Sequence, residues 1–287
     1  MARALGAAGC QVVALGHGGW PEDEWRQWGI SRWHACDITA GNLQRHAGDV
    51  DAVVHCAGAA DVAFSGVHPL ESFAKTVSTT ADVLELLRVR LPRARLVLVS
   101  SAAVYGDTSG KPIGESDPVA PISVYGVHKQ MAEELCACYA RIYALRVSVL
   151  RLFSIYGPGL RKQLLWDACN KLAAGLLSFA GTGAEMRDWL HVSDAAALAA
   201  ALLQAETQPY RVLNGGTGTG ASVSQVLEEL SAALDVRGRV VFTGGERSGN
   251  PRSLVADSTQ ARSLGWRPAY DWRSGVREYA RWFRSIA

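Results

Sequence analysis

The chain has 287 residues, a formal net charge of +2, and 48% hydrophobic against 20% charged residues. This balance is typical of a globular protein with a substantial core. Because Lys and Arg are scattered, the sequence gives no indication of a nucleic-acid-binding stripe or a membrane-binding helix. No apolar run approaches the ~18 residues that a transmembrane helix needs, and the apolar N-terminus is too short for a secretory signal.

Cysteine spacing fits neither a disulfide framework nor a zinc site. The cysteines are Cys10, Cys36, Cys56, Cys136, Cys138 and Cys169. We interpret them as small, mostly buried residues of a cytoplasmic protein, and we expect no metal centre.

Short apolar runs alternate with helical patterns up to about Thr217. The runs that predict strands span residues 11–15, 52–55, 95–101, 146–153 and 210–215. The helical patterns span residues 70–89, 124–142, 166–174 and 193–203. Continuous apolar strands are typical of a parallel sheet that is covered on both faces. The alternation therefore predicts a doubly wound α/β fold.

After Thr217 the pattern changes. A helix is expected at residues 222–234, a short strand at 239–242 and a final helix at 274–285. We interpret this part of the chain as a smaller lobe that packs over the open end of the sheet.

Tyr125 and Lys129 lie four residues apart in the predicted helix at 124–142, which places both side chains on one helical face. An ammonium group beside a phenol stabilises the phenolate and makes the tyrosine a useful base. An ordinary amphipathic helix can carry the same pair, so this short pattern is weak when taken alone.

Ser101 ends the predicted strand at 95–101. Ligands of doubly wound sheets bind beyond the carboxyl ends of the strands, so a hydroxyl there can hydrogen-bond a substrate oxygen while a nearby tyrosine exchanges its proton. The alternative is a turn serine that caps local backbone groups.

Together, these residues resemble the Ser and Tyr-x-x-x-Lys triad of the extended short-chain dehydrogenase/reductase family, which includes nucleotide-sugar epimerases and dehydratases. Seven motifs of that family occur in order over nearly the whole chain. They stand at residues 36–38, 51–58, 99–106 with 125–129, 151–158, 187–194, 213–218, and 247–251 with 264–268. The chain is therefore identified as a member of this family that is similar to UDP-glucose 4-epimerase.

The resemblance implies a Rossmann domain for the dinucleotide, made of residues 1–160 and 188–216. Residues 161–187 and 217–287 would form the smaller lobe that binds the nucleotide-sugar. The catalytic residues implied are Ser101, Tyr125 and Lys129. Family members often dimerise through the two helices that correspond to residues 70–89 and 124–142, so we expect a homodimer by resemblance.

The resemblance also implies NAD as the cofactor. Asp37 and Ile38 are expected beside its adenine, and Ala57 and Gly58 beneath it. Tyr125, Lys129 and Phe153 are expected on its nicotinamide side. His17 joins them because it follows Gly16, where folds that prefer NAD usually hold an acid. His17 could face a 2′-phosphate, which keeps NADP as the alternative, or it could belong to a surface loop.

The family opens with a strand and a Gly-x-x-Gly-x-x-Gly turn that carries the cofactor pyrophosphate. Neither is found in this sequence, because residues 1–9 resemble the helix that should follow the turn. We therefore expect the sheet to lack its first strand, through a misassigned start or a truncation. The alternative is a non-catalytic member that has lost the cofactor.

On the substrate side, Arg187 and Arg247 match family positions that hold the nucleotide diphosphate, since a guanidinium fork binds phosphate oxygens with two hydrogen bonds. Either arginine could instead form a surface ion pair. Asn250 matches a position where relatives often have an acid that contacts the ribose. Ser101 and Ser154 are the expected sugar contacts, although many relatives have an asparagine in place of Ser154.

The reaction type follows from the residues after Ser101. Sugar dehydratases of the family have an Asp-Glu pair there, whereas this chain has Ala102 and Ala103, so we expect no dehydration. The predicted activity is NAD-dependent 4-epimerisation of a UDP-hexose through a transient 4-keto sugar, as part of carbohydrate metabolism and polysaccharide biosynthesis. An NAD(P)H-dependent 4-ketoreductase needs the same residues and remains open, as does a non-catalytic member.

Overall fold

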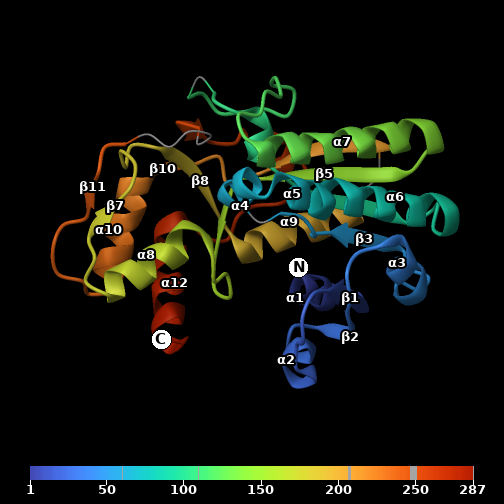
Figure 1. Ribbon diagram of the computed structural model, residues 1–287, viewed down its shortest axis with the longest axis horizontal. Coiled ribbons are helices and arrows are strands. Elements are labelled where there is room, and N and C mark those ends of the chain that lie inside the picture. Colours follow the sequence, from blue (N-terminus) through green and yellow to red (C-terminus); the bar gives the residue numbers. More distant parts are fainter. Residues whose placement is uncertain (60, 109, 206–207, 246–250, 287) are drawn as a thin grey trace.

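The computed structural model describes residues 1–59, 61–108, 110–205, 208–245 and 251–286 (Figure 1). The strands are β1 (Val12–Gly16), β2 (Ile30–Ala35), β3 (Ala52–His55), β4 (Arg95–Ser101), β5 (Arg146–Leu152), β6 (Ser154–Tyr156), β7 (Ser178–Phe179), β8 (Met186–His191), β9 (Tyr210–Gly215), β10 (Gly220–Ser222), β11 (Val241–Phe242) and β12 (Ser253–Leu254).

The helices before the middle of the chain are α1 (Ala2–Ala7), α2 (Glu22–Gln27), α3 (Ala40–His46), α4 (Val62–Val67), α5 (Pro69–Phe73), α6 (Thr79–Arg90) and α7 (Val124–Tyr143). The later helices are α8 (Gln163–Ala173), α9 (Val192–Gln204), α10 (Val223–Ala233), α11 (Thr259–Ser263) and α12 (Trp272–Ile286). A π-helical turn, η1 (Ala74–Ser78), joins α5 to α6, and a 3₁₀ helix, η2 (Ala102–Tyr105), follows β4.

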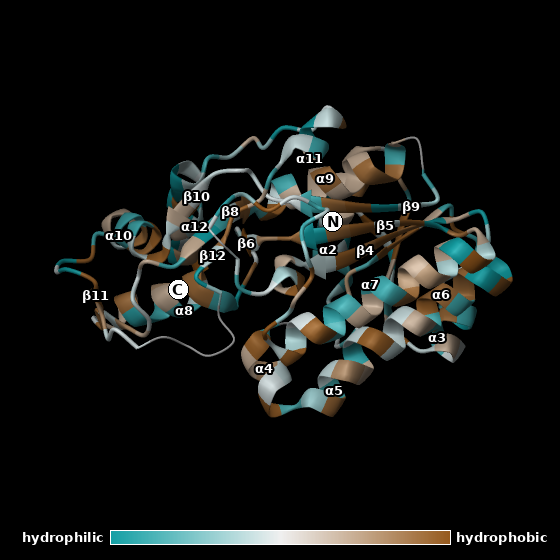
Figure 2. Ribbon diagram, turned by 90° about the horizontal axis from the view of Figure 1, so that it is seen from above, coloured by the Kyte–Doolittle hydropathy of each residue, from teal (hydrophilic) through white to brown (hydrophobic). Residues whose placement is uncertain are grey.

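The main sheet is parallel and has the order β3-β4-β5-β9. Figure 2 shows α3, α6 and α7 on one of its faces and α9 on the other. Leu84 of α6 and Cys136 of α7 are buried with Leu98 of β4 in the core of the first face. Leu198 of α9 is buried with Leu150 of β5 on the opposite face. Strands covered on both faces are what the continuous apolar runs predict, so the doubly wound α/β fold is confirmed.

The first two strands do not belong to the main sheet. β1 and β2 form a separate parallel pair. Within the described ranges, β1 pairs only with β2, and β3 pairs only with β4. Helix α1 packs against β1, β2 and α9.

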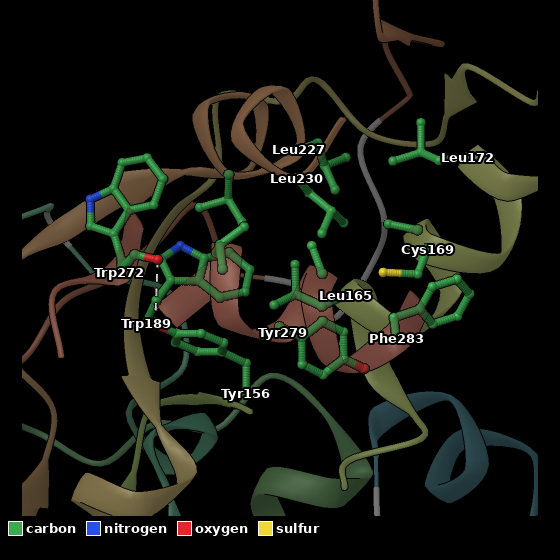
Figure 3. Close-up of a cluster of buried hydrophobic side chains, with 14 of the residues drawn as sticks. Tyr156, Leu165, Cys169, Leu172, Trp189, Leu227, Leu230, Trp272, Tyr279 and Phe283 are labelled. Atoms are coloured by element: carbon green, nitrogen blue, oxygen red, sulfur yellow. Dashed lines mark hydrogen bonds between the residues drawn. The ribbon is translucent and has the colours of Figure 1, made fainter. Parts of the chain in front are cut away.

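The C-terminal part of the chain has its own apolar core between α8, α10 and α12 (Figure 3). Leu165 of α8, Leu227 of α10 and Tyr279 of α12 are buried there together with Trp189 of β8. Strand β8 pairs with β10 and β12 and also with β6, which follows strand β5 of the main sheet in the chain. The limits of the two predicted domains stay a proposal.

Most predicted elements are confirmed. The strands expected at 52–55, 95–101 and 210–215 have the same ends in the structure, and the strand expected at 11–15 begins one residue later as β1. The helix expected at 70–89 is divided into α5, η1 and α6. The final helix, expected at 274–285, is longer as α12. Residues 1–9, interpreted as helical, contain α1.

No helix within the described parts of the chain is both long and apolar enough to cross a membrane.

The prediction that the cysteines are mostly buried is wrong for Cys10 and Cys56, which are exposed, and Cys36 and Cys138 are only half-buried. These four lie at strand ends or on a helix surface rather than in an apolar cluster.

Candidate active site

Ser101 is the last residue of β4 and therefore lies at the carboxyl end of the main sheet. Its side-chain oxygen accepts a hydrogen bond from the backbone N–H of Ala103 at 3.2 Å and so caps η2. The backbone cap that was considered as an alternative role is therefore present. A serine hydroxyl that accepts one hydrogen bond can still donate its proton, so the cap does not prevent contact with a substrate oxygen.

Helix α7 carries the other two predicted catalytic residues. The helix starts after Ser123, whose hydroxyl accepts from the backbone N–H of Gly126 at 3.1 Å. Tyr125 is half-buried, and Lys129, one turn further, is buried. The Lys129 ammonium lies 5.9 Å from the centroid of the Tyr125 ring and donates to the backbone carbonyl of Val99 at 3.0 Å. The lysine is thus tied to the strand that ends in Ser101.

Gly126 brings α7 close to the segment that follows Ser101. A Cβ atom at this position would lie 2.5 Å from the carbonyl oxygen of Ala103 and 2.8 Å from the Cβ of Pro121. Only a glycine allows the first turn of α7 to pack this closely against η2. The helix that carries Tyr125 and Lys129 therefore packs against the segment that follows Ser101. The catalytic role of the three residues stays a prediction.

The nicotinamide side of the predicted cofactor site is formed around Gly58. This glycine has a φ angle of 156°, and an added Cβ would lie 3.1 Å from the Lys129 ammonium and 3.4 Å from the Thr76 hydroxyl. The next backbone N–H, of Ala59, donates to the same Thr76 hydroxyl at 3.0 Å. Ala57, the residue before Gly58, is half-buried. The missing side chain lets Lys129 and Thr76 approach the backbone of Gly58 this closely, and the contact of Ala57 and Gly58 with NAD stays a prediction.

Phe153 directly follows β5 and is buried with Tyr105 and Ala102 in a small cluster next to Ser101. Its backbone N–H donates to the carbonyl of Gly215 at 3.0 Å. The neighbouring Ser154 is half-buried and pairs with Trp189 of β8. Phe153 therefore lies close to the residue that follows the predicted catalytic serine.

The adenine side is more exposed. Nδ1 of His17 lies 2.9 Å from a carboxylate oxygen of Asp37, and the two side chains are 71% and 70% exposed. Ile38 packs against the core beneath α3. A Cβ on Gly16 would lie 2.8 Å from the Trp33 ring, which covers the end of β1. These residues suit the adenine end of a dinucleotide, but among the residues that the structure describes we identify no phosphate-binding glycine turn between the two ends.

Arg187 is buried, at 8% exposure. Its guanidinium donates to the carbonyl of Pro251 at 2.7 Å and to that of Met186 at 2.8 Å. Burial lowers the pKa of this group. The other predicted nucleotide contacts, Arg247 and Asn250, lie outside the described residues.

A buried polar network lies behind the catalytic segment. Its members join β4, β5, β9, η2 and α7, and they are Ser100, Tyr105, Glu133, Arg151 and Asn214. Burial alone would lower the pKa of Arg151, but hydrogen bonds and the charge of Glu133 raise it instead. The sequence interpretation did not find Glu133, although its position four residues after Lys129 is a usable signal.

His55, at the end of β3, provides a prediction about pH. Burial, and to a smaller extent the charge of Lys129, lowers the pKa of His55 from 6.5 to about 4. Because the unfolded chain binds a proton at higher pH than the folded protein does, stability should fall as the pH drops from about 6.5 to 4, by roughly 3 kcal/mol in total.

The measurement is the free energy of unfolding between pH 4 and 7 for the wild type and His55→Gln. We expect a shallower pH dependence in the variant. Other histidines contribute equally to both proteins, so equal slopes would contradict the assignment.

Residues 1–216 match the NAD dependent epimerase/dehydratase family. The chain therefore belongs to the NAD dependent epimerase/dehydratase family, and its cofactor class is NAD.

Individual relatives agree with this assignment. UDP-glucose 4-epimerase of Azospirillum brasilense is 34% identical over 261 residues, covering 83% of this chain and 74% of that protein. UDP-glucose 4-epimerase of Streptococcus mutans is 32% identical and covers 78% of this chain and 73% of that protein. The solved structure of MoeE5 with UDP-glucuronic acid and NAD superposes with a TM-score of 0.88 at 28% identity, over 99% of this chain and 94% of MoeE5.

The comparisons do not support the prediction that the first strand and the glycine turn are missing. The family match starts at residue 1, and the MoeE5 structure aligns with 99% of this chain. That prediction rested on the likeness of residues 1–9 to the helix that follows the turn, which is a local pattern, whereas the comparisons use the whole chain.

Proposed function

We propose that the protein catalyses the NAD-dependent 4-epimerisation of a UDP-hexose through a transient 4-keto sugar. The observation that supports this proposal is the position of Lys129, which lies one turn after Tyr125 on α7 and donates to the Val99 carbonyl at 3.0 Å, two residues before Ser101. Ala102 and Ala103 follow the serine, so the carboxylates that a sugar dehydratase would need there are replaced by methyl groups.

Each of the three residues has a defined part in the proposed reaction. Tyr125, as phenolate, takes the proton of the sugar 4-hydroxyl, and the Lys129 ammonium stabilises the negative charge of that phenolate. The Ser101 hydroxyl donates a hydrogen bond to the same sugar oxygen and holds it near Tyr125. Bound NAD would supply the acceptor and donor of the hydride at carbon 4. Once the 4-keto sugar has rotated in the site and presents its other face, Tyr125 returns the proton to the oxygen.

For the substrate, we propose a UDP-sugar. Solved relatives contain UDP-glucuronic acid or UDP-glucose together with NAD. The diphosphate would be held by Arg187 and Arg247, the ribose by Asn250, and the sugar by Ser101 and Ser154. Arg187 already donates to backbone carbonyls of Met186 and Pro251, and this fixes the guanidinium in the lobe.

We also propose a homodimer formed through α5, α6 and α7. Large apolar side chains are exposed on α7 and on the helices beside it, and Leu70 and Val67 are 80% and 74% exposed. Val127 and Met131 add to this surface from α7. The division into residues 1–160 with 188–216 and residues 161–187 with 217–287 is part of the same proposal, as is a cytoplasmic location.

The test is a product assay with purified protein, NAD and separate samples of UDP-glucose and UDP-glucuronic acid. The expected product has the same mass as its substrate and the opposite configuration at carbon 4, without net consumption of cofactor. A product that is lighter by one water would contradict the proposal. Turnover that occurs only with a 4-keto sugar and consumes NADH would indicate the ketoreductase instead, and no turnover with any substrate would favour a non-catalytic member.

A further inference from the structure

Helix α7 presents a third functional side chain on the face that carries Tyr125 and Lys129. Glu133 follows Lys129 by four residues and is 4% exposed. Its carboxylate accepts a short hydrogen bond from the hydroxyl of Ser100, the residue before Ser101. A buried carboxylate is costly unless it is paired and hydrogen-bonded, so this contact is strongly determined.

The partner of Glu133 is Arg151, which lies opposite Ser100 in the register of β4 and β5. Arg151 donates from Nη2 to Oε2 of Glu133 at 2.7 Å and from Nε to both carboxylate oxygens at 3.1 Å. Both side chains are nearly inaccessible, at 7% and 6% exposure. The fork geometry restricts the carboxylate in direction as well as in distance.

The pair is held from its far side too. Nη1 of Arg151 donates to the Tyr105 hydroxyl at 2.9 Å, and that hydroxyl donates to the side-chain carbonyl of Asn214 at 2.7 Å. Tyr105 ends η2, and Asn214 belongs to β9. The arginine therefore cannot follow a displaced Glu133 without losing its hydrogen bond to Tyr105, whose own hydroxyl is held by Asn214.

We propose that Glu133 and Arg151 are positioning residues, which fix the rotation of α7 and thereby hold Tyr125 and Lys129 against Ser101. This inference rests on the proposed function. Glu133 and Lys129 attach the helix to adjacent residues of β4, through Ser100 and the Val99 carbonyl. If α7 turned or slid, a buried charge would lose its partner. The catalytic tyrosine therefore has one position relative to the serine.

A purely structural role makes a different prediction. Exchanging both members of a buried ion pair for apolar residues is often neutral for stability or even stabilising, because the desolvation cost of the charges also disappears. A double replacement therefore separates positioning from folding. If the pair only stabilises the core, then activity should persist whenever the double variant folds.

The experiment compares Glu133→Leu/Arg151→Leu with Glu134→Leu, which changes the neighbouring exposed glutamate of the same helix. For the double variant we expect a melting temperature close to that of the wild type and a KM for the UDP-sugar within about twofold. Its kcat should be about 10- to 100-fold lower, because a misplacement of about 1 Å can cost 10²-fold. The Glu134→Leu control should keep both constants.

A second variant and a second readout cover the case in which the double variant does not fold. Arg151→Lys keeps the charge but loses the fork, so kcat should fall while KM stays. In the same variant, hydrogen exchange of the backbone amides at 125–129 should be about tenfold faster than in the wild type, because α7 is held less firmly. Wild-type protein without epimerase activity would refute the proposed function alone, and exchange would then decide about positioning. An unchanged kcat in these variants would overturn the inference. If the wild type is inactive, an unchanged rate of hydrogen exchange in the variants would overturn it.

Discussion

Replacing Tyr125 with phenylalanine should lower kcat by roughly 10²–10⁴, the usual contribution of a general base. The substitution removes one hydroxyl from a half-buried ring, so folding and the affinity for NAD should be close to those of the wild type. The Lys129 ammonium, held by the Val99 carbonyl at 3.0 Å, would remain in place without a phenolate to stabilise. Steady-state kinetics with the UDP-sugar that the wild type converts would measure the effect.

Tyr143→Phe is the matched control, because Tyr143 ends the same helix and is 46% exposed. The control should retain wild-type kcat. Near-normal turnover by Tyr125→Phe would show that another group carries the proton, and the assignment of the catalytic pair would then be wrong.

The largest expected effect on stability comes from Arg151→Leu alone. This change leaves the carboxylate of Glu133 buried without its charged partner, a situation that costs about 3–5 kcal/mol. The melting temperature should therefore fall by on the order of 10 °C. Denaturant unfolding of the purified variant gives the free energy directly.

Arg146→Leu serves as its control, because Arg146 begins the same strand and is exposed. We expect that control to change the free energy of unfolding by less than about 0.5 kcal/mol. If Arg151→Leu and Glu133→Leu/Arg151→Leu were equally destabilised, the loss would not come from an unpaired carboxylate.

The sequence predicted the elements of the main sheet well because their signals are local. Arg95–Ser101 is a continuous apolar run that ends in two serines, and β4 has the same limits. Tyr125 and Lys129 are found by a spacing of four on one helix. Strand β2 was not predicted, because its residues are largely exposed and mix polar with aromatic side chains.

The polar network could not be predicted in the same way. Glu133 and Arg151 are separated by 18 residues, and the Tyr105 hydroxyl reaches Asn214 across 109 residues. Pairing over such distances depends on the register between strands and on how α7 lies over them, and neither property is written in a local pattern. The hydrogen bond from Arg187 to the carbonyl of Pro251 has the same origin, since the two residues are 64 positions apart.

The most direct test of the central claim follows the hydrogen at carbon 4. UDP-glucose carrying deuterium at that carbon is converted by the protein in the presence of NAD and an excess of unlabelled NADH in solution. The account predicts UDP-galactose that retains the deuterium at carbon 4, because the hydride leaves and returns within one site while Tyr125 exchanges only the hydroxyl proton. Product that has lost the label, or a 4-keto sugar that accumulates, would contradict epimerisation through a transient enclosed intermediate.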